Sequence, residues 1–359
     1  MKKQTILKIF SAIFIFLAGF VFAETITVDD DGPADYTTIQ AAVNASVDTD
    51  VIIIQPGMYT GTGNRDIDFL GKAITVRSTN PQDPNIVSDT VIDSQGTSSD
   101  WHRAFRFHTN EDANSVVGGL MLTGGYTDYG GAINCEVNCS PTIRNCIIRG
   151  NTVTQEGGGI DCTTSKAVII NCLIEDNISG YYAGGINCCE SSDLTVIGCT
   201  IRNNSAENDG GGIQFCVSSG QVINCSITNN TGLEGGGIWV RGAVHISNCT
   251  IANNTATRSG GYGGALALDY DSATVTNCIL WDNIPNEVYT WSHTPSVSYC
   301  DVKGGWSGAG GNNIDIDVAS SIRDEVNKAK GSIGDFTNPI GKIKNKVIDD
   351  ITGPIKRNK

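Results

Sequence analysis

An internal repeat of about 26 residues runs through the middle of this 359-residue sequence. A glycine-rich block that closes on an aliphatic residue occurs six times, and its last residue advances by 27, 26, 27, 25 and 28 positions. The six blocks end at Ile133, Ile160, Ile186, Ile213, Ile238 and Leu266. A second block, which reads NCIIRGN from Asn145 to Asn151, keeps the same period. Repeats of this length are typical of chains in which each unit stacks on its neighbours.

Within each repeat, inward and outward residues alternate with the period of a β-strand. In the second block the cysteine and the aliphatic residue two positions later therefore face the same side. Glycine pairs and asparagines separate these short strands, and no helix-length amphipathic segment lies between them. Because such a unit cannot bury its own apolar face, parallel stacking is needed to build a core and to pair the backbone groups of adjacent coils. The repeat thus predicts an all-β fold, a parallel β-helix or β-solenoid, with equivalent residues in columns about 4.8 Å apart.

Three of the predicted columns have structural explanations. The cysteine column contains Cys146, Cys172, Cys199, Cys225, Cys249 and Cys278. The asparagine column contains Asn151, Asn177, Asn204, Asn230, Asn254 and Asn283. We expect the asparagines to take left-handed backbone at corners and to hydrogen-bond to one another along the axis. We expect the glycine column to form corners that leave no room for a Cβ atom.

The two ends of the chain differ from its repetitive middle. Residues 1–23 have the pattern of a secretory signal peptide, with three lysines, an apolar run from Ile9 to Phe22 and small residues before a cleavage point at Ala23. Because the apolar run is short and no second run follows, we expect a secreted or cell-surface protein with no transmembrane segment after cleavage; an uncleaved anchor is the alternative. Residues 35–47 show helical spacing behind Asp35 as an N-cap, which predicts a helix that caps the open end of the solenoid.

Charge separates the chain further. The formal net charge of −14 argues against nucleic acids and anionic membranes as partners. Residues 24–317, the predicted solenoid with its regular repeats at about 118–283, carry 12 basic and 33 acidic residues, whereas residues 318–359 carry 9 basic and 5 acidic residues. We expect this tail to be partly helical or disordered. It could cap the last coil or tether the protein to an acidic surface.

Thirteen cysteines in an exported chain would ordinarily suggest a disulfide framework. In a parallel stack, however, neighbouring cysteines have parallel Cα–Cβ vectors and miss the approach of about 3.8 Å between Cβ atoms that a disulfide needs. We therefore expect mostly reduced thiols that pack as small apolar groups, with a second inward column beginning at Cys135, Cys162 and Cys188. The odd number leaves at least one thiol unpaired, and no cysteine spacing typical of a zinc site is present.

A candidate ligand-binding edge precedes the glycine blocks. The residue directly before each block is aromatic or acidic in all six copies: Tyr129, Glu156, Tyr182, Asp209, Glu234 and Tyr262. Stacked on one outer edge, these rings and carboxylates could contact the CH faces and hydroxyls of a sugar chain. Asp209 and Glu234 would be neighbours, close enough for one pKa to rise, for a Ca²⁺ ion to sit between them, or for a catalytic role. A solvated acidic edge is the alternative.

A basic cluster lies earlier in the chain. Its members are His102, Arg103, Arg106 and His108. Arg106 and His108 alternate with two phenylalanines and so share one strand face. Cations there could neutralise an acidic sugar and accept a proton from it, which makes Arg106 and His108 further catalytic candidates. The alternative is surface ion pairing with Asp100, Glu111 and Asp112.

Together these patterns resemble the right-handed parallel β-helix of the pectin-lyase-like superfamily. The blocks from 130 to 283 are similar to the polymorphic outer-membrane protein repeat of bacterial surface proteins, which pairs GGAI with FxxN; here the second block reads IxxN, as at 148–151. The opening YTTIQAAV (36–43), followed by VIIIQPGMY (51–59), resembles that of pectin methylesterases. The resemblance covers about residues 25–317 and implies right-handed coils, in a superfamily that contains lyases, hydrolases, esterases, epimerases and adhesins.

The enzyme motifs that this resemblance would imply are missing. The sequence lacks QDT and DFIFG of the pectin methylesterases, GHG of the polygalacturonases, and WIDH and RxPxxR of the pectate lyases. Residues 255–262 form the one modest insertion in the central repeats. We therefore expect a monomer without a cofactor, apart from the Ca²⁺ considered above. It would bind extracellular polysaccharide or another cell-surface component without turnover, or serve as an adhesion or surface-structural protein. The alternative is a carbohydrate-active enzyme, with a polysaccharide lyase ranked before a glycoside hydrolase.

Overall fold

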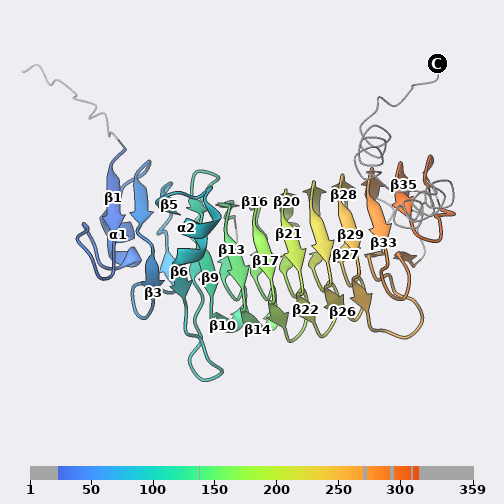
Figure 1. Ribbon diagram of the computed structural model, residues 1–359, viewed down its shortest axis with the longest axis horizontal. Helices are drawn as coiled ribbons and strands as arrows, with labels where there is room; N and C mark the ends of the chain where they lie inside the picture. Colours follow the sequence, from blue (N-terminus) through green and yellow to red (C-terminus); the bar gives the residue numbers. More distant parts are fainter. Residues whose placement is uncertain (1–22, 137, 270–272, 292–294, 309, 315–359) are drawn as a thin grey trace, which may run out of the picture.

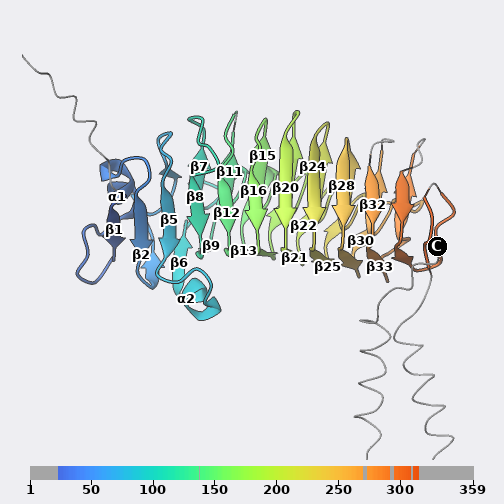
Figure 2. The same cartoon turned by 90° about the horizontal axis from the view of Figure 1, so that it is seen from above.

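The computed structural model describes residues 23–314 except 137, 270–272, 292–294 and 309. Figures 1 and 2 show these residues as an elongated stack of coils that advances from the N-terminal end, in blue, to the C-terminal end, in orange. The labelled strands form four parallel sheets, and each strand bonds to its equivalents in the coils before and after. Register partners such as Ile148 and Ile174 are 26 residues apart in the chain. The predicted all-β parallel β-helix is therefore confirmed.

Two of the sheets run along most of the stack. The first has eleven strands: β1 (Thr25–Val28), β2 (Val51–Ile54), β5 (Thr75–Ser78), β8 (Val116–Gly118), β12 (Thr142–Arg144), β16 (Val168–Ile170), β20 (Asp193–Ile197), β24 (Ser219–Ile223), β28 (Val244–Ser247), β32 (Thr274–Thr276) and β35 (Ser296–Ser298). The second has ten strands: β3 (Gly57–Tyr59), β6 (Thr90–Asp93), β9 (Met121–Thr123), β13 (Ile147–Arg149), β17 (Leu173–Glu175), β21 (Thr200–Arg202), β25 (Ser226–Thr228), β29 (Thr250–Ala252), β33 (Ile279–Trp281) and β36 (Asp301–Val302).

The other two sheets meet at the edge that carries the candidate ligand residues. The nine-stranded sheet contains β4 (Ile67–Asp68), β7 (Phe105–Phe107), β11 (Ile133–Cys135), β15 (Ile160–Thr163), β19 (Ile186–Cys189), β23 (Ile213–Cys216), β27 (Ile238–Arg241), β31 (Leu266–Leu268) and β34 (Val288–Thr290). The six-stranded sheet contains β10 (Tyr126–Tyr129), β14 (Thr152–Glu156), β18 (Ile178–Ser179), β22 (Ser205–Ala206), β26 (Thr231–Gly232) and β30 (Thr255–Ala256). In each central coil the chain leaves the six-stranded sheet and turns directly into the nine-stranded sheet.

The core fills the interior of the coils because alternate residues of each strand point inward. The residue two positions after each of the six column cysteines is fully buried; examples are Ile148, Ile174 and Ile201. Burial of one such side chain contributes roughly 1.5–3 kcal/mol relative to leaving it exposed. Larger rings fill the first coils, where the centroids of Phe69 and Phe107 lie 4.9 Å apart.

The cysteine column is a buried, hydrogen-bonded ladder that continues to Cys300. Each thiol donates to the carbonyl oxygen two residues earlier, as Cys172 does to Ile170 at 3.4 Å. In four steps the backbone N–H also lies 3.4 Å from the Sγ atom of the next coil, for example between Cys172 and Cys199. All thirteen cysteines are free in the structure, and their reduced state stays a prediction. The second inward column is also present, since Cys135, Cys162 and Cys188 are buried register partners.

The asparagine column forms a buried amide ladder through all six predicted residues. The Nδ2 atom of Asn151 donates to Oδ1 of Asn177 at 2.9 Å, and each later pair repeats this bond at 2.9–3.0 Å. The expectation of left-handed backbone at these asparagines is wrong. The corner falls one residue earlier, for example at Asn203 (φ 55°) and Asn253 (φ 57°), because the ladder residue must direct its amide along the axis inside the coil.

The capping helix is shorter than predicted. Helix α1 (Ile39–Ala45) buries residues through Val43, whereas Val47 is exposed. Asp35 does not cap the helix: its carboxylate accepts hydrogen bonds from the backbone N–H and the hydroxyl of Thr27, at 2.8 and 2.7 Å. These bonds hold the chain to the first strand and lower the pKa of Asp35. The carboxylate of Asp35 therefore accepts hydrogen bonds from Thr27 in the first coil and does not act as the predicted N-cap of the helix.

A second helix, α2 (Pro84–Asp89), was not predicted. The carboxylate of Asp83 accepts a hydrogen bond from the N–H of Asn85 at 3.0 Å, and Pro84 occupies the first turn, where an N–H is not needed. The helix contributes one buried residue, Val87, so no apolar periodicity marks it in the sequence. In the described part of the chain, neither helix is long and apolar enough to cross a membrane.

The cysteine ladder ends, within the described residues, at the last described coil. The N–H of Cys300 donates to Oδ1 of Asn313 at 2.9 Å, and the N–H of Ile314 donates to the carbonyl oxygen of Cys300 at 2.9 Å. Asn313 thus takes the place that a further cysteine would occupy. The predicted signal peptide at 1–23, apart from residue 23, and the predicted tail at 318–359 lie outside the described residues.

Candidate functional site

The six edge residues lie in one file between the six-stranded and nine-stranded sheets. At each of five steps, the N–H that follows one edge residue donates to the carbonyl oxygen of the next edge residue at 2.9–3.0 Å. The residue after each edge position has a left-handed φ between 56° and 72°, and it is glycine in every copy except Ala183. This repeated corner brings together the predicted side chains, which are Tyr129, Glu156, Tyr182, Asp209, Glu234 and Tyr262.

Asp209 and Glu234 lie on consecutive coils of this edge. Glu234 is buried and forms an ion pair with Arg258, which lies in the loop after β30. Burial, followed by the charge of Glu234, raises the pKa of Asp209 to about 7. Arg258 was not a sequence candidate, because the irregular loop that carries it has no counterpart in the other repeats. The site therefore combines two carboxyl groups with a guanidinium group.

Partly exposed aromatic rings gather at the C-terminal end of the same face. Tyr262 of the edge, Tyr289 on β34 and Trp291 just beyond it form what we name the aromatic cluster. The ring centroids of Tyr262 and Tyr289 lie 4.6 Å apart, and those of Tyr289 and Trp291 lie 4.9 Å apart. Trp291 is 37% exposed, and the guanidinium of Arg258 lies 4.5 Å from the centre of the Tyr262 ring. Sequence reasoning missed Tyr289 and Trp291 because they follow the last regular repeat.

A file of polar side chains beside this edge was also missed. It follows register partners on the outer face of the nine-stranded sheet, from β11 to β27: Asn134, Asp161, Asn187, Gln214 and Trp239. These residues are at most 7% exposed, although they point away from the core. Edge side chains cover them, as where Nδ2 of Asn187 donates to Oε2 of Glu156 at 2.9 Å. A polar residue directly after the aliphatic end of four blocks was the available sequence signal.

Asp161 lies between two hydrogen-bond donors in this polar file. Nδ2 of Asn187 donates to one carboxylate oxygen at 2.7 Å, and the hydroxyl of Thr163 donates to the other at 3.0 Å. Burial still raises the pKa of Asp161 to about 7, because desolvation outweighs both bonds. Burial also raises the pKa of Glu156, which shares the same amide. Asp161 is only 2% exposed, which keeps substrate away from it.

This environment predicts a pH-dependent loss of stability. Between about pH 4 and pH 7 the folded protein retains a proton on Asp161 that the unfolded chain has released. The unfolded state then binds fewer protons, so the free energy of unfolding falls as pH rises. Asp161→Asn should therefore be more stable than the wild type at pH 8 by on the order of 4 kcal/mol, and similar to it at pH 4.

Urea denaturation from pH 4 to pH 8 measures this difference. The control is Asp89→Asn, at the exposed end of α2, whose stability profile should run parallel to that of the wild type. An Asp161→Asn protein that differs from the wild type by the same amount at both pH values would contradict the prediction.

The basic cluster lies at the N-terminal end of the same face. Its members Arg103, Arg106 and His108, but not His102, line a pocket of about 310 Å³ together with Trp101. Both carboxylate oxygens of Glu136 accept from Arg106, at 2.8 and 3.1 Å, and this pairing raises the pKa of Arg106. Nε2 of His108 lies 3.1 Å from the carboxylate of Asp68. The remaining pairs are Arg103 with Asp128, and His102 with Asp66 and Asp100. A guanidinium held in this way is poorly suited to accept a proton.

The partners of this cluster differ from the expected ones. Of the three acidic residues considered in the sequence, Asp100 does pair with the cluster. Glu111 instead is buried, where it accepts from the N–H groups of Gly71 and Thr109 and from the thiol of Cys139. The contact between Arg106 and Glu136 was not predicted, because the two residues lie on neighbouring coils and are far apart in the sequence.

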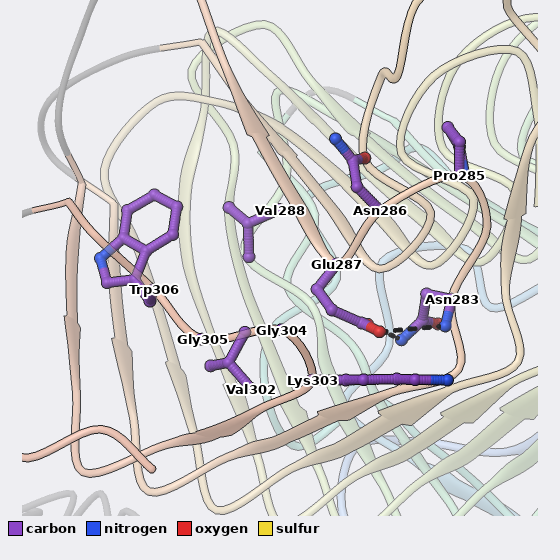
Figure 3. Close-up of a pocket in the computed structure, with 10 residues that line it drawn as sticks. All are labelled: Asn283, Pro285, Asn286, Glu287, Val288, Val302, Lys303, Gly304, Gly305 and Trp306. Atoms are coloured by element: carbon purple, nitrogen blue, oxygen red, sulfur yellow. Dashed lines mark hydrogen bonds between the residues drawn. The ribbon is translucent and has the colours of Figure 1, made fainter. Parts of the chain in front are cut away.

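A further pocket, of about 450 Å³, lies at the C-terminal end of the stack (Figure 3). Figure 3 shows Glu287 directed toward Asn283, whose Nδ2 donates to it at 2.5 Å. Glu287 therefore ends the amide ladder at the point where the next asparagine would stand. Burial raises the pKa of Glu287. We interpret this pocket as a structural feature at the end of the amide ladder, because its acidic group, Glu287, is already hydrogen-bonded to Asn283.

One group of three carboxylates could hold a metal ion within the described ranges. It consists of Asp29, Asp30 and Asp31, whose ligand atoms all lie within 4.8 Å of one another. The group lies between β1 and α1, at the opposite end of the solenoid from the aromatic cluster. It is an exposed to half-exposed run of like charge. The Asp209 and Glu234 pair is a separate feature.

Comparison with known proteins supports the fold. A family model described as "Right handed beta helix region" matches residues 125–255 and 185–323, together more than half of the chain. The solved structure of the pectate lyase Pel9A is similar, with a TM-score of 0.55 and 14% identity over 82% of this chain and 80% of that chain. A pectin methylesterase from carrot gives a TM-score of 0.41 and 13% identity, over 82% of this chain and 89% of that chain. No curated protein sequence matches the chain.

At these identities the structural likeness concerns the fold alone. The family match agrees with the predicted right-handed coil. The more specific likeness to polymorphic outer-membrane protein repeats stays a prediction.

Proposed function

Because this chain belongs to the right-handed β-helix family, we propose that it is an exported, non-catalytic protein that binds extracellular polysaccharide along the outer edge of its coils. Residues 1–23 support export, since they have the pattern of a signal peptide. The net charge of −14 favours a neutral or cationic ligand, or a glycan that is contacted mainly through its CH faces. We further propose that the protein acts as a monomer, because the stack supplies the whole edge from one chain.

The aromatic cluster is the observation that carries this proposal. Its three rings are partly exposed on the outer face, and the ion pair between Glu234 and Arg258 adjoins them. Aromatic faces bind the apolar CH surface of a sugar ring, while carboxylate and guanidinium groups bind its hydroxyls. The cluster thus offers both kinds of contact in one place.

A second pair of rings lies farther along the same edge. Tyr181 and Tyr182 have ring centroids 4.2 Å apart, and Tyr181 is exposed. The coils repeat at about 4.8 Å, so a chain molecule laid along the edge meets an equivalent side chain at each coil. A linear polymer fits this arrangement better than a small molecule does, because the contacts repeat without a deep pocket.

A polysaccharide lyase is the second candidate function. The pocket lined by Trp101 and three members of the basic cluster favours it, because cations and an aromatic ring could receive an acidic sugar. The bidentate contact between Arg106 and Glu136 disfavours it, because Arg106 would have to leave that partner and lose a proton to act as a base. We therefore rank binding first.

A glycan array probed with the purified protein tests the proposal. We expect binding to at least one plant or microbial polysaccharide, followed by isothermal titration with that polysaccharide. Trp291→Ala and Tyr262→Ala should each weaken binding about 10-fold, as expected for the loss of one stacked ring. Met58→Ala, at an exposed position on the ten-stranded sheet, should leave the affinity unchanged.

Two outcomes would reverse the assignment. If Trp101→Ala weakens binding and Trp291→Ala does not, the basic pocket is the ligand site. If incubation with polyuronates produces unsaturated sugars that absorb ultraviolet light, and Arg106→Ala abolishes this product, the protein is a lyase. Failure of every glycan on the array to bind the wild type would remove the binding proposal itself.

A further inference from the structure

Two cysteines stand apart from the buried columns. Cys188 points into the core on β19, so Cys189, the next residue, points outward, and Cys216 on β23 points outward in the same register. The two are direct partners on adjacent parallel strands. Cys216 is partly exposed, whereas the other twelve cysteines are buried. The outer face therefore carries an adjacent pair of thiols with access from solvent.

The spacing of this pair suits a bridging cation better than a disulfide. Adjacent strands lie about 4.8 Å apart, and the two Cα–Cβ bonds run parallel. A disulfide needs Cβ atoms about 3.8 Å apart, so the two strands would have to approach each other. With metal–sulfur bonds close to the zinc–thiolate length of about 2.3 Å, a cation held in a line between two thiolates spans about 4.6 Å between sulfur atoms. That span matches the separation of the strands.

We propose that Cys189 and Cys216 form a two-coordinate site for a soft monovalent cation of the Cu(I) or Ag(I) class. Soft thiolate ligands select such cations over hard ones. Each thiol releases its proton to water when it binds, so the complex of two thiolates and one monovalent cation carries a charge of −1.

The surroundings of the pair favour this charge. Arg241 on β27 is the register partner of Cys216 and provides a positive group beside the proposed complex, although it also lies 3.6 Å from Asp269. The thiol of Cys189 donates to Oδ1 of Asn187 at 3.4 Å, which orients it on the outer face.

The choice of cation also follows from the number of ligands. Zinc in a structural site takes four ligands. Among the residues that the structure describes, the thiol pair has no third cysteine, histidine or carboxylate within the mutual spacing of 4.8 Å that defines a three-ligand group. A cation that accepts two sulfur ligands in a line is therefore preferred over zinc.

The buried cysteine ladder does not compete for the cation, although its rungs have the same spacing. Each ladder thiol donates to the carbonyl oxygen two residues earlier, and several also accept a backbone N–H. A cation would have to enter the core and displace these bonds. The outer pair thus differs from the inner column in two respects: solvent reaches the outer pair, and the thiols of the inner column are already held by backbone hydrogen bonds.

Anaerobic titration of the reduced protein with Cu(I), in competition with the chromophoric chelator bathocuproine disulfonate, tests the proposal. We expect one Cu(I) per chain. Cys189→Ser and Cys216→Ser should each weaken binding at least about 100-fold, because one of two ligands is lost. Thr163→Ser is the matched control, since Thr163 is the register partner of Cys189 one coil earlier, and it should leave the affinity unchanged.

Several results would overturn the proposal. These are no Cu(I) retained by the wild type against the chelator, undiminished binding by the Cys189→Ser/Cys216→Ser double variant, or a disulfide between the two residues after air oxidation in the absence of metal. If the serine variants fail to fold by circular dichroism, X-ray absorption of the wild-type Cu(I) complex decides: two sulfur neighbours support the site, and three or more contradict it.

Discussion

Gly184→Ala is expected to prevent the central coils from stacking at their normal separation. A Cβ atom on Gly184 would lie 2.5 Å from the backbone nitrogen of Ser205 and 2.6 Å from the carbonyl oxygen of Gly211, both in the next coil. These atoms belong to the backbone and cannot rotate away. The two coils would have to separate along a hydrogen-bonded sheet, so we expect the free energy of unfolding to fall by more than about 3 kcal/mol.

The matched control is Gly150→Asn, at a different corner of the coil. Gly150 has a φ of +65°, but the nearest atom to a Cβ built there is 3.5 Å away. The equivalent positions in later coils are Asp176, Asn203 and Asn229, which adopt φ values of 55–56° with a side chain present. Gly150→Asn should therefore change stability by less than about 1 kcal/mol. Urea denaturation that finds the two variants equally stable would contradict the close-approach argument.

Asn204→Ala is expected to break the amide ladder and to destabilise the protein by about 3–5 kcal/mol. Oδ1 of Asn204 accepts from both the N–H and Nδ2 of Asn177, and its own Nδ2 donates to Oδ1 of Asn230 and to the carbonyl oxygen of Ile174. Alanine removes all four bonds while the partners stay buried. Their lost hydrogen bonds cannot be replaced by water unless the coils open.

The control for this variant is its neighbour in the chain. Asn203 is exposed and has left-handed backbone, which glycine adopts without strain, so Asn203→Gly should cost less than about 1 kcal/mol. Denaturation curves and amide hydrogen exchange would report the difference between the two variants. If Asn204→Ala loses no more stability than Asn203→Gly, the ladder contributes little, and the core packing alone holds the coils together.

The repeat predicted the interior of the coils accurately. Its period placed Cys172 above Cys146 and Asn177 above Asn151, and the pairing of adjacent strands has the same register. The prediction succeeded because both columns lie inside regular strands, where the direction of a side chain depends only on its parity in the chain. It failed by one residue for the left-handed corner, because asparagine suits both a corner and an amide ladder, and sequence alone did not distinguish these uses.

The irregular segments were predicted less well. The N-cap at Asp35 was wrong because Thr27, in the first strand, offers two donors to the same carboxylate. Helix α2 was missed because it buries one residue. In both cases the outcome depends on contacts with a neighbouring segment, which a pattern within one window of sequence cannot contain.

The candidate site divides in the same way. The edge file could be predicted, because a fixed offset from each glycine block identifies residues such as Asp209 and Glu234. Arg258, Tyr289 and Trp291 could not, because they lie in a loop and in the last coils, where no repeat gives an offset.

The period of the chain was sufficient to establish a parallel stack, its inward columns and the order of residues along its edge, because those properties depend on spacing alone. Which side chains are buried, and which residues they bind, was decided only by the tertiary structure. Asp161 and Asn187 occupy outward positions, yet side chains from the edge cover them, and Arg106 pairs with Glu136 of the next coil. The physical reason is that exposure and charge pairing depend on neighbours about 26 residues or more away, and on loops whose paths no repeat specifies.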